Sequence, residues 1–65
     1  MTVLHEFTYT APHDADFEDI FLASTKVVKR QVAEQNYQVR YQLVFIKKEE
    51  VKEGYTHYFQ IQTCD

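Results

Sequence analysis

Apolar and polar side chains alternate along residues 2–10, which is the period of a β-strand with one buried face. The more apolar face carries Val3, His5, Phe7 and Tyr9. Leu4 and Glu6 fall on the opposite face, among threonines. Because many of these side chains are β-branched or aromatic and Pro12 follows them, we expect a strand that ends in a turn at residues 11–13.

The period changes to that of an amphipathic helix over residues 14–35. Its mainly apolar stripe consists of Phe17, Ile20, Phe21, Ser24, Val27, Val28, Gln31, Val32 and Gln35. Asp14 or Asp16 can cap the N-terminus, and acidic residues in the first turn with basic residues further along suit the helix dipole. Leu22 falls on the polar side of this helix and is our first candidate for a contact made from the helix.

Two further strands are predicted after Asn36, which we expect to end the helix. The strand at residues 37–48 has one face with Tyr37, Val39, Tyr41, Leu43 and Phe45, and an opposite face with Gln38, Arg40, Gln42, Val44 and Ile46. The strand at residues 55–63 has Tyr55, His57, Phe59 and Ile61 on one face, and Thr56, Tyr58, Gln60 and Gln62 on the other. The charged segment 49–54 is typical of a hairpin loop, in which Gly54 takes a positive φ.

The order β-α-β-β predicts one α+β domain over residues 1–65. If the helix returns the chain to the edge where it started, the strand order 1-3-2 makes every pair of neighbours antiparallel. The order 3-2-1 with a right-handed crossover is the alternative. In the preferred order one helix covers one face of a three-stranded antiparallel sheet.

The opposite face of this sheet has no partner within the chain. It gathers Leu4, Glu6, Arg40, Gln42, Val44, Ile46, Tyr58 and Gln60. Its apolar members would form an exposed patch of the kind that marks interaction sites, and the strand at residues 37–48 would present an open edge. We expect these residues, together with Leu22, to form a partner or self-association interface, most simply in a two-fold dimer. A monomer with a wet, Gln- and Thr-rich outer face is the alternative.

Size and charge narrow the class of protein. A chain of 65 residues seldom builds a core worth more than a few kcal/mol, and a single cysteine forms no internal disulfide, so packing of the ten aromatics and self-association are the expected supports. The net charge of −3 and the mixing of basic with acidic residues make nucleic acid an unexpected partner. No apolar run approaches the length of a membrane span. We therefore expect a soluble, cytoplasmic protein.

Groups that could carry chemistry are few. His5 and His57 fall on neighbouring strands in the 1-3-2 order and could bind a metal or act as an acid–base pair, although packing at the sheet margin is the favoured interpretation. Cys64 is next to the last residue, Ser24 lies on the apolar helical stripe, and one glycine cannot build a phosphate-binding loop. We assign no catalytic, metal or cofactor residue.

The element order and length resemble those of the dodecins, small flavin-binding proteins in which a helix packs on a three-stranded antiparallel sheet and which assemble into hollow dodecamers. The residues that carry the resemblance are Asp16–Phe17–Glu18–Asp19, after a turn. Dodecins have a tryptophan early in the second strand, where Tyr37 is the nearest aromatic. Small tautomerases of similar length have proline directly after Met1, where this chain has Thr2. Neither family is assigned.

Three hypotheses about function follow. The first is a small non-catalytic protein-binding module that self-associates and acts as an inhibitor or adaptor by occupying a partner protein. The second is a homo-oligomer that binds a small ligand in an aromatic- and Gln-lined pocket between subunits. The third is an enzyme that uses His5 and His57, and it has the weakest support.

Overall fold

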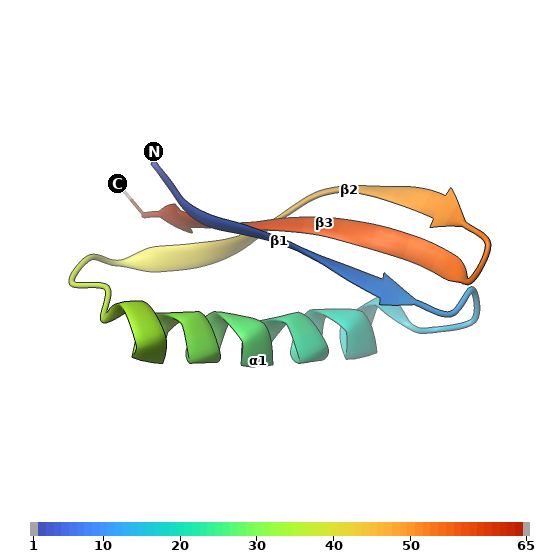
Figure 1. Cartoon of the computed structure of the whole chain (residues 1–65), viewed down its shortest axis with the longest axis horizontal. Coiled ribbons are helices and arrows are strands. Elements are labelled where there is room, and N and C mark those ends of the chain that lie inside the picture. Colours follow the sequence, from blue (N-terminus) through green and yellow to red (C-terminus); the bar gives the residue numbers. More distant parts are fainter. Residues whose placement is uncertain (1, 65) are drawn as a thin grey trace.

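The computed structural model describes residues 2–64 and contains one helix and three strands (Figure 1). In chain order these are β1 (Val3–Ala11), α1 (Phe17–Gln35), β2 (Tyr41–Val51) and β3 (Gly54–Thr63). The strands form one sheet in the order β1-β3-β2, and both neighbouring pairs are antiparallel. The predicted α+β fold and its 1-3-2 strand order are therefore confirmed.

The ends of α1 follow the signals in the sequence. Asp16 occupies the N-cap position with extended backbone, and Glu18 and Asp19 lie in the first turn. At the other end Asn36 takes the left-handed conformation (φ 53°) and its N–H donates to the Val32 carbonyl at 2.8 Å. Asparagine tolerates this conformation better than most residues, so the chain leaves the helix there.

The boundaries of β2 differ from the prediction. Residues 37–40 belong to the connection rather than to the strand, whereas the charged residues at 49–51, predicted as loop, continue β2. The ladder extends because Val51 pairs with Gly54, which reduces the hairpin turn to residues 52–53. Charged side chains are tolerated here because β2 is an edge strand with an exposed surface.

Two register shifts move side chains to the other face of the sheet. In β1 the pairing skips from Val3 to His5, and in β2 it skips from Phe45 to Lys47, so Leu4 and Ile46 are the extra residues of two bulges. Val3 consequently pairs with Gln62, on the face opposite to the one that strict alternation predicted. A bulge leaves no reliable signature in the period of the sequence, so this correction depends on the structure.

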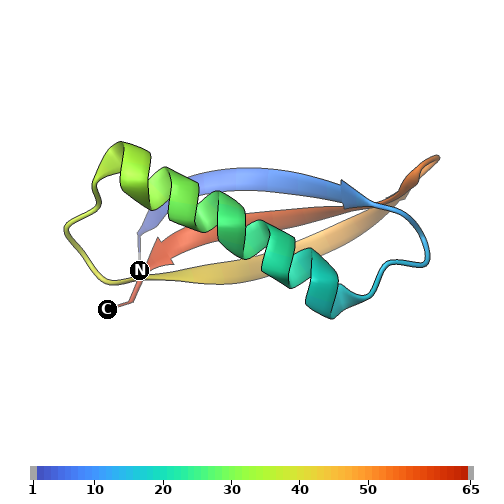
Figure 2. The same ribbon diagram turned by 90° about the horizontal axis from the view of Figure 1, so that it is seen from below.

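The core lies between the sheet and α1, which crosses one face of the sheet obliquely (Figure 2). Phe59, on the central strand, is almost fully buried and contacts the rings of Phe7, Phe21 and Phe45 at centroid distances of 5.5–6.4 Å. From the helix, the buried side chains are Ile20, Ser24 and Val28. The Ser24 hydroxyl donates to the Ile20 carbonyl at 2.9 Å, which satisfies a polar group inside this layer.

Within residues 2–64, no helical segment has the combination of length and apolar character that crossing a membrane requires.

Gly54 follows the β2–β3 turn, and its backbone lies close to the end of β1. This close approach gives the first testable prediction. Its φ is +153°, as the sequence predicted for a positive-φ glycine, and a Cβ at this position would overlap the backbone carbonyl of Ala11. We expect Gly54→Ala to lower the free energy of unfolding by about 2 kcal/mol or more, measured by urea denaturation. The adjacent exposed turn variant Glu53→Ala should change it by less than about 0.5 kcal/mol. Equal stabilities for the two variants would contradict this account of the turn.

Candidate functional site

The side of the sheet that faces away from α1 is called the outer face. It is defined by cross-strand pairs from all three strands: Val3–Gln62, Glu6–Gln60, Thr8–Tyr58, Thr10–Thr56, Gln42–Gln62, Val44–Gln60, Lys47–Tyr58 and Glu49–Thr56. Directly opposite residues in an antiparallel pair point to the same side, so these side chains share one surface.

A charged cluster holds one end of the outer face. Lys47 Nζ lies 2.9 Å from Glu49 Oε1 and 4.9 Å from the centre of the Tyr58 ring. The Tyr58 hydroxyl donates to Glu49 Oε2 at 3.2 Å. Hydrogen bonds from Lys47 and then Tyr58, together with the charge of Lys47, lower the pKa of Glu49, while the hydrogen bond and charge of Glu49 raise the pKa of Lys47.

A chain of amides crosses the middle of the same face. Gln62 Nε2 donates to Gln60 Oε1 at 2.8 Å, and Gln60 Nε2 donates to Glu6 Oε1 at 3.2 Å. At the end nearer the β2–β3 turn, in the same cross-strand row as Glu49, the hydroxyls of Thr10 and Thr56 are 2.9 Å apart. The outer face is therefore an organised polar surface rather than a mainly apolar one.

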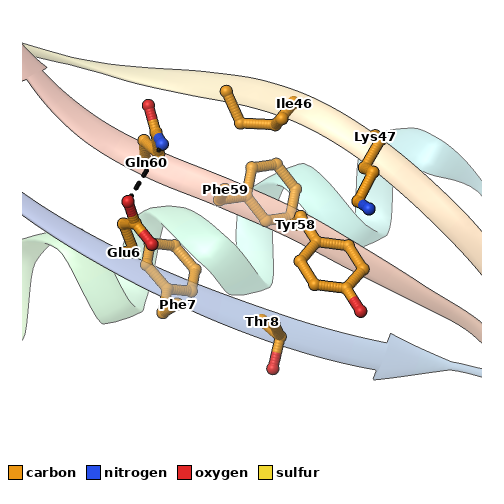
Figure 3. Close-up of a pocket in the computed structure, with 8 residues that line it drawn as sticks. All are labelled: Glu6, Phe7, Thr8, Ile46, Lys47, Tyr58, Phe59 and Gln60. Carbon is orange, nitrogen blue, oxygen red and sulfur yellow. Dashed lines mark hydrogen bonds between the residues drawn. The ribbon is translucent and has the colours of Figure 1, made fainter. Parts of the chain in front are cut away.

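A shallow hollow of about 480 Å³ lies between these two networks. It is lined by Glu6, Phe7, Thr8, Ile46, Lys47, Tyr58, Phe59 and Gln60. Figure 3 shows the Tyr58 ring with Lys47 beside it, and the Glu6–Gln60 hydrogen bond. The hollow combines a flat ring, an amide, a carboxylate and an ammonium group within one concave surface.

The nine residues predicted to form an interface do not all lie together. On the outer face the strand pairs place Glu6, Gln42, Val44, Tyr58 and Gln60, and Ile46 lines the hollow on this face. Leu4 is the extra residue of the bulge in β1, so no strand pair assigns it to either face. Arg40 precedes β2, where its carbonyl accepts a hydrogen bond from the Cys64 N–H at 3.1 Å. Leu22 lies on α1, in the other layer, and is 58% exposed, as its place on the polar side of the helix predicted.

The apolar part of the predicted patch is smaller than expected. Leu4, Val44 and Tyr58 are half-buried, and only Ile46 among the apolar members is well exposed. Whether these residues form an interface stays a prediction.

A second surface, which the sequence did not indicate, lies where α1 meets β2. We call it the α1–β2 seam and define it by Phe17, Phe21, Tyr41 and Phe45, which are 38–48% exposed. Phe17 contacts the rings of Phe21 and Phe45 at 6.1 and 5.3 Å, and Tyr41 lies on the same face of β2 as Phe45. In Figure 2 the beginning of β2, in yellow, lies clear of the helix.

The seam was missed because periodicity gives the face of a side chain but not its coverage. Phe17 and Phe21 were assigned to the apolar stripe of the helix, and Tyr41 and Phe45 to the face of the sheet that packs on it, which is correct. The helix, however, approaches β1 more closely than the other strands. A comparison of the width of one helix with that of three strands could have indicated the partial coverage. A helix about 10 Å wide covers about two strands spaced at about 4.8 Å.

The two histidines of the third hypothesis are not neighbours. His5 pairs with Ile61 and His57 pairs with Tyr9, so they lie about 13 Å apart along the sheet. His57 is buried among the rings of Phe17, Phe45 and Phe59, and its Nδ1 has no hydrogen-bond partner. Across residues 2–64, no group of three or more His, Cys, Asp or Glu side chains could hold a metal ion.

The Lys47–Glu49–Tyr58 cluster gives the second prediction. Both charged side chains are about half exposed, so the cluster contributes little stability in salt. The direction of its dependence on pH follows from the two pKa shifts. The contribution of Glu49 to stability is lost as the pH falls through its lowered pKa, and that of Lys47 is lost as the pH rises through its raised pKa. In Glu49→Gln the pKa of Lys47, measured by NMR titration, should fall towards its ordinary value.

The neighbouring variant Glu50→Gln is the matched control, because Glu50 contacts His13 instead, at 3.3 Å. It should leave the pKa of Lys47 unchanged. Equal effects of the two variants on Lys47 would rule out the specific pairing with Glu49.

The chain matches no family model, and no significant similarity to a curated protein or to a solved structure is found. Its function is therefore inferred from its own residues and their geometry.

Proposed function

We propose that this protein is a small non-catalytic protein-binding module that self-associates and acts as an inhibitor or adaptor by occupying a partner protein. The observation that carries this proposal is the imbalance between buried and exposed apolar side chains. Among residues 2–64, five hydrophobic residues are buried, whereas eight large hydrophobic side chains are exposed. Exposed apolar surface on this scale is more typical of a chain that binds another protein than of one that acts alone.

The shape of the chain supports the same proposal. Its radius of gyration is 12.4 Å, against about 11 Å for a compact domain of this length. It exposes 4733 Å², against about 4400 Å² for a typical monomer of the same mass. A thin, extended slab offers more contact area per residue than a compact one, which suits a binding module.

Two surfaces are available for this role. The outer face offers amide, carboxylate and ammonium groups around Val44 and Ile46, which suits a polar-rimmed contact with a partner protein. The α1–β2 seam offers aromatic side chains, which are enriched in the centres of protein interfaces.

We place the protein in the cytoplasm as part of this proposal, because its one cysteine serves no internal disulfide.

Binding of a small ligand by a homo-oligomer is the second candidate function, and the hollow on the outer face favours it. The Tyr58 ring could stack against a flat ligand, with Gln60 and Lys47 as hydrogen-bond donors. If another subunit covered this open hollow, it would become a pocket between subunits.

The proposed self-association predicts the behaviour of the pure protein in solution. Sedimentation equilibrium should give a weight-average mass above the 7.8 kDa of one chain, rising with protein concentration. A strict monomer at every concentration examined would contradict self-association.

The proposed partner is tested by affinity capture from the source cells, with binding then measured on the purified partner. Val44→Glu introduces a charge into the outer face and should weaken this binding by about ten-fold or more. Ala33→Glu introduces the same side chain at an exposed helix position and should leave binding unchanged. Equal affinities for both variants would exclude the outer face as the partner site.

The second candidate function is tested by native mass spectrometry of protein purified from its source. It predicts an oligomer that carries a bound small molecule, lost in Tyr58→Ala but retained in Thr25→Ala, a position on α1 away from the hollow. Oligomers without any added mass would contradict ligand binding.

A further inference from the structure

We propose that a second copy of this chain docks on the α1–β2 seam, and that residues 41–45 of β2 pair antiparallel with the same residues of that copy across a two-fold axis. The inference rests on the proposed self-association and identifies the surface that carries it. The occupant is a second copy rather than an unrelated protein because the pairing segment is complementary to itself.

The free edge of β2 is protected along only half of its length. Sheet edges resist pairing with other chains when they carry bulges or charged side chains. The second half of β2 has both, a bulge at Ile46 followed by Lys47 and Lys48. Residues 41–45 have no charge, proline, glycine or bulge, so this half of the edge is open to another strand.

The other edge of the sheet is a poorer docking site. β1 is bulged at Leu4, carries Glu6, and is the strand that α1 approaches most closely. Its helix-facing side chains, Phe7, Tyr9 and Ala11, are half-buried or buried, whereas Tyr41 and Phe45 of β2 are exposed. The apolar exposure and the unprotected edge therefore coincide at β2.

The sequence of residues 41–45 is symmetric in the sense that a two-fold axis requires. With the axis at Leu43, Tyr41 of one copy lies opposite Phe45 of the other, and Gln42 lies opposite Val44. Each of these pairs combines side chains from the same face of the sheet, so the helix-facing layers of the two copies stay continuous. Because the strands are antiparallel, the lysines of the two copies lie at opposite ends of the pairing and do not repel each other.

The side-chain layer beneath this edge would be completed by the same arrangement. Phe17 of α1 contacts the Phe45 ring, and Phe21 contacts Phe17. Both helix residues remain 38–48% exposed. Across the axis the two seams come side by side, and each supplies aromatic surface to the other. Aromatic pairs of this kind stabilise contacts beyond the area that they bury.

The inference is tested by sedimentation equilibrium of two lysine variants. Tyr41→Lys introduces a charge into the seam and should raise the dimer dissociation constant by about ten-fold or more. Thr8→Lys introduces the same charge on the outer face of the other edge strand, at an exposed position, and should leave the dissociation constant unchanged. Circular dichroism establishes that both variants are folded.

The possible outcomes separate this inference from the proposed function. If the wild-type chain is a monomer, the proposed self-association fails and the inference fails with it. If the wild-type chain associates but Thr8→Lys weakens it and Tyr41→Lys does not, the copies meet through the outer face. The seam inference is then overturned, while the proposed function stands.

Hydrogen exchange of the wild-type amides provides a second test that needs no variant. Raising the protein concentration should slow exchange by about ten-fold or more at alternate amides of residues 41–45, because strand pairing uses every second edge N–H. An associated protein whose exchange at these amides is independent of concentration would overturn edge pairing. If exchange at these amides slows only when a different protein is added, the edge of β2 pairs with that protein and the proposed second copy is overturned.

Discussion

The packing of one helix onto Phe59, at the centre of a three-stranded sheet, is the contact on which the rest of this structure depends. Phe59 lies on the middle strand and contacts aromatic rings from α1, β1 and β2. A single helix is too narrow to cover all three strands equally. Because α1 lies closest to β1, the apolar side chains near β2 are left with partial coverage.

The two uncovered surfaces are organised differently, and the difference follows from their side chains. On the outer face the polar groups pair with one another across the strands, so water can remain there without leaving donors or acceptors unsatisfied. At the α1–β2 seam the exposed groups are aromatic rings beside an unprotected edge. Covering the seam removes apolar area from water, whereas covering the outer face requires a partner that replaces its hydrogen bonds.

Much of the fold could be predicted from the sequence. The periods of the four elements, the stop at Asn36 and the glycine at position 54 indicated the element order. The preference for antiparallel neighbours favoured the 1-3-2 sheet, which the structure has, over the 3-2-1 alternative. The bulges at Leu4 and Ile46 were not predictable, because a bulge shifts pairing by one residue without changing the composition of the strand. The start of β2 was placed too early because Tyr37 and Val39 continue the alternating pattern outside the strand.

The candidate site was predictable only in part. The element order predicted an unpartnered outer face, but the hydrogen bonds that make this face polar depend on the register of the strands. The seam depends on where the helix lies over the sheet, and no residue pattern specifies that position. Periodicity therefore assigned Phe17 and Phe45 to the buried layer, although both remain well exposed within one chain.

The most direct measurement of the proposed assembly is an isotope-filtered nuclear Overhauser experiment on a mixture of labelled and unlabelled chains, which detects contacts between copies alone. Pairing about Leu43 predicts contacts between the Tyr41 ring of one copy and the Phe45 ring of the other. Contacts between copies that involve only outer-face residues, or a complete absence of such contacts, would contradict the account.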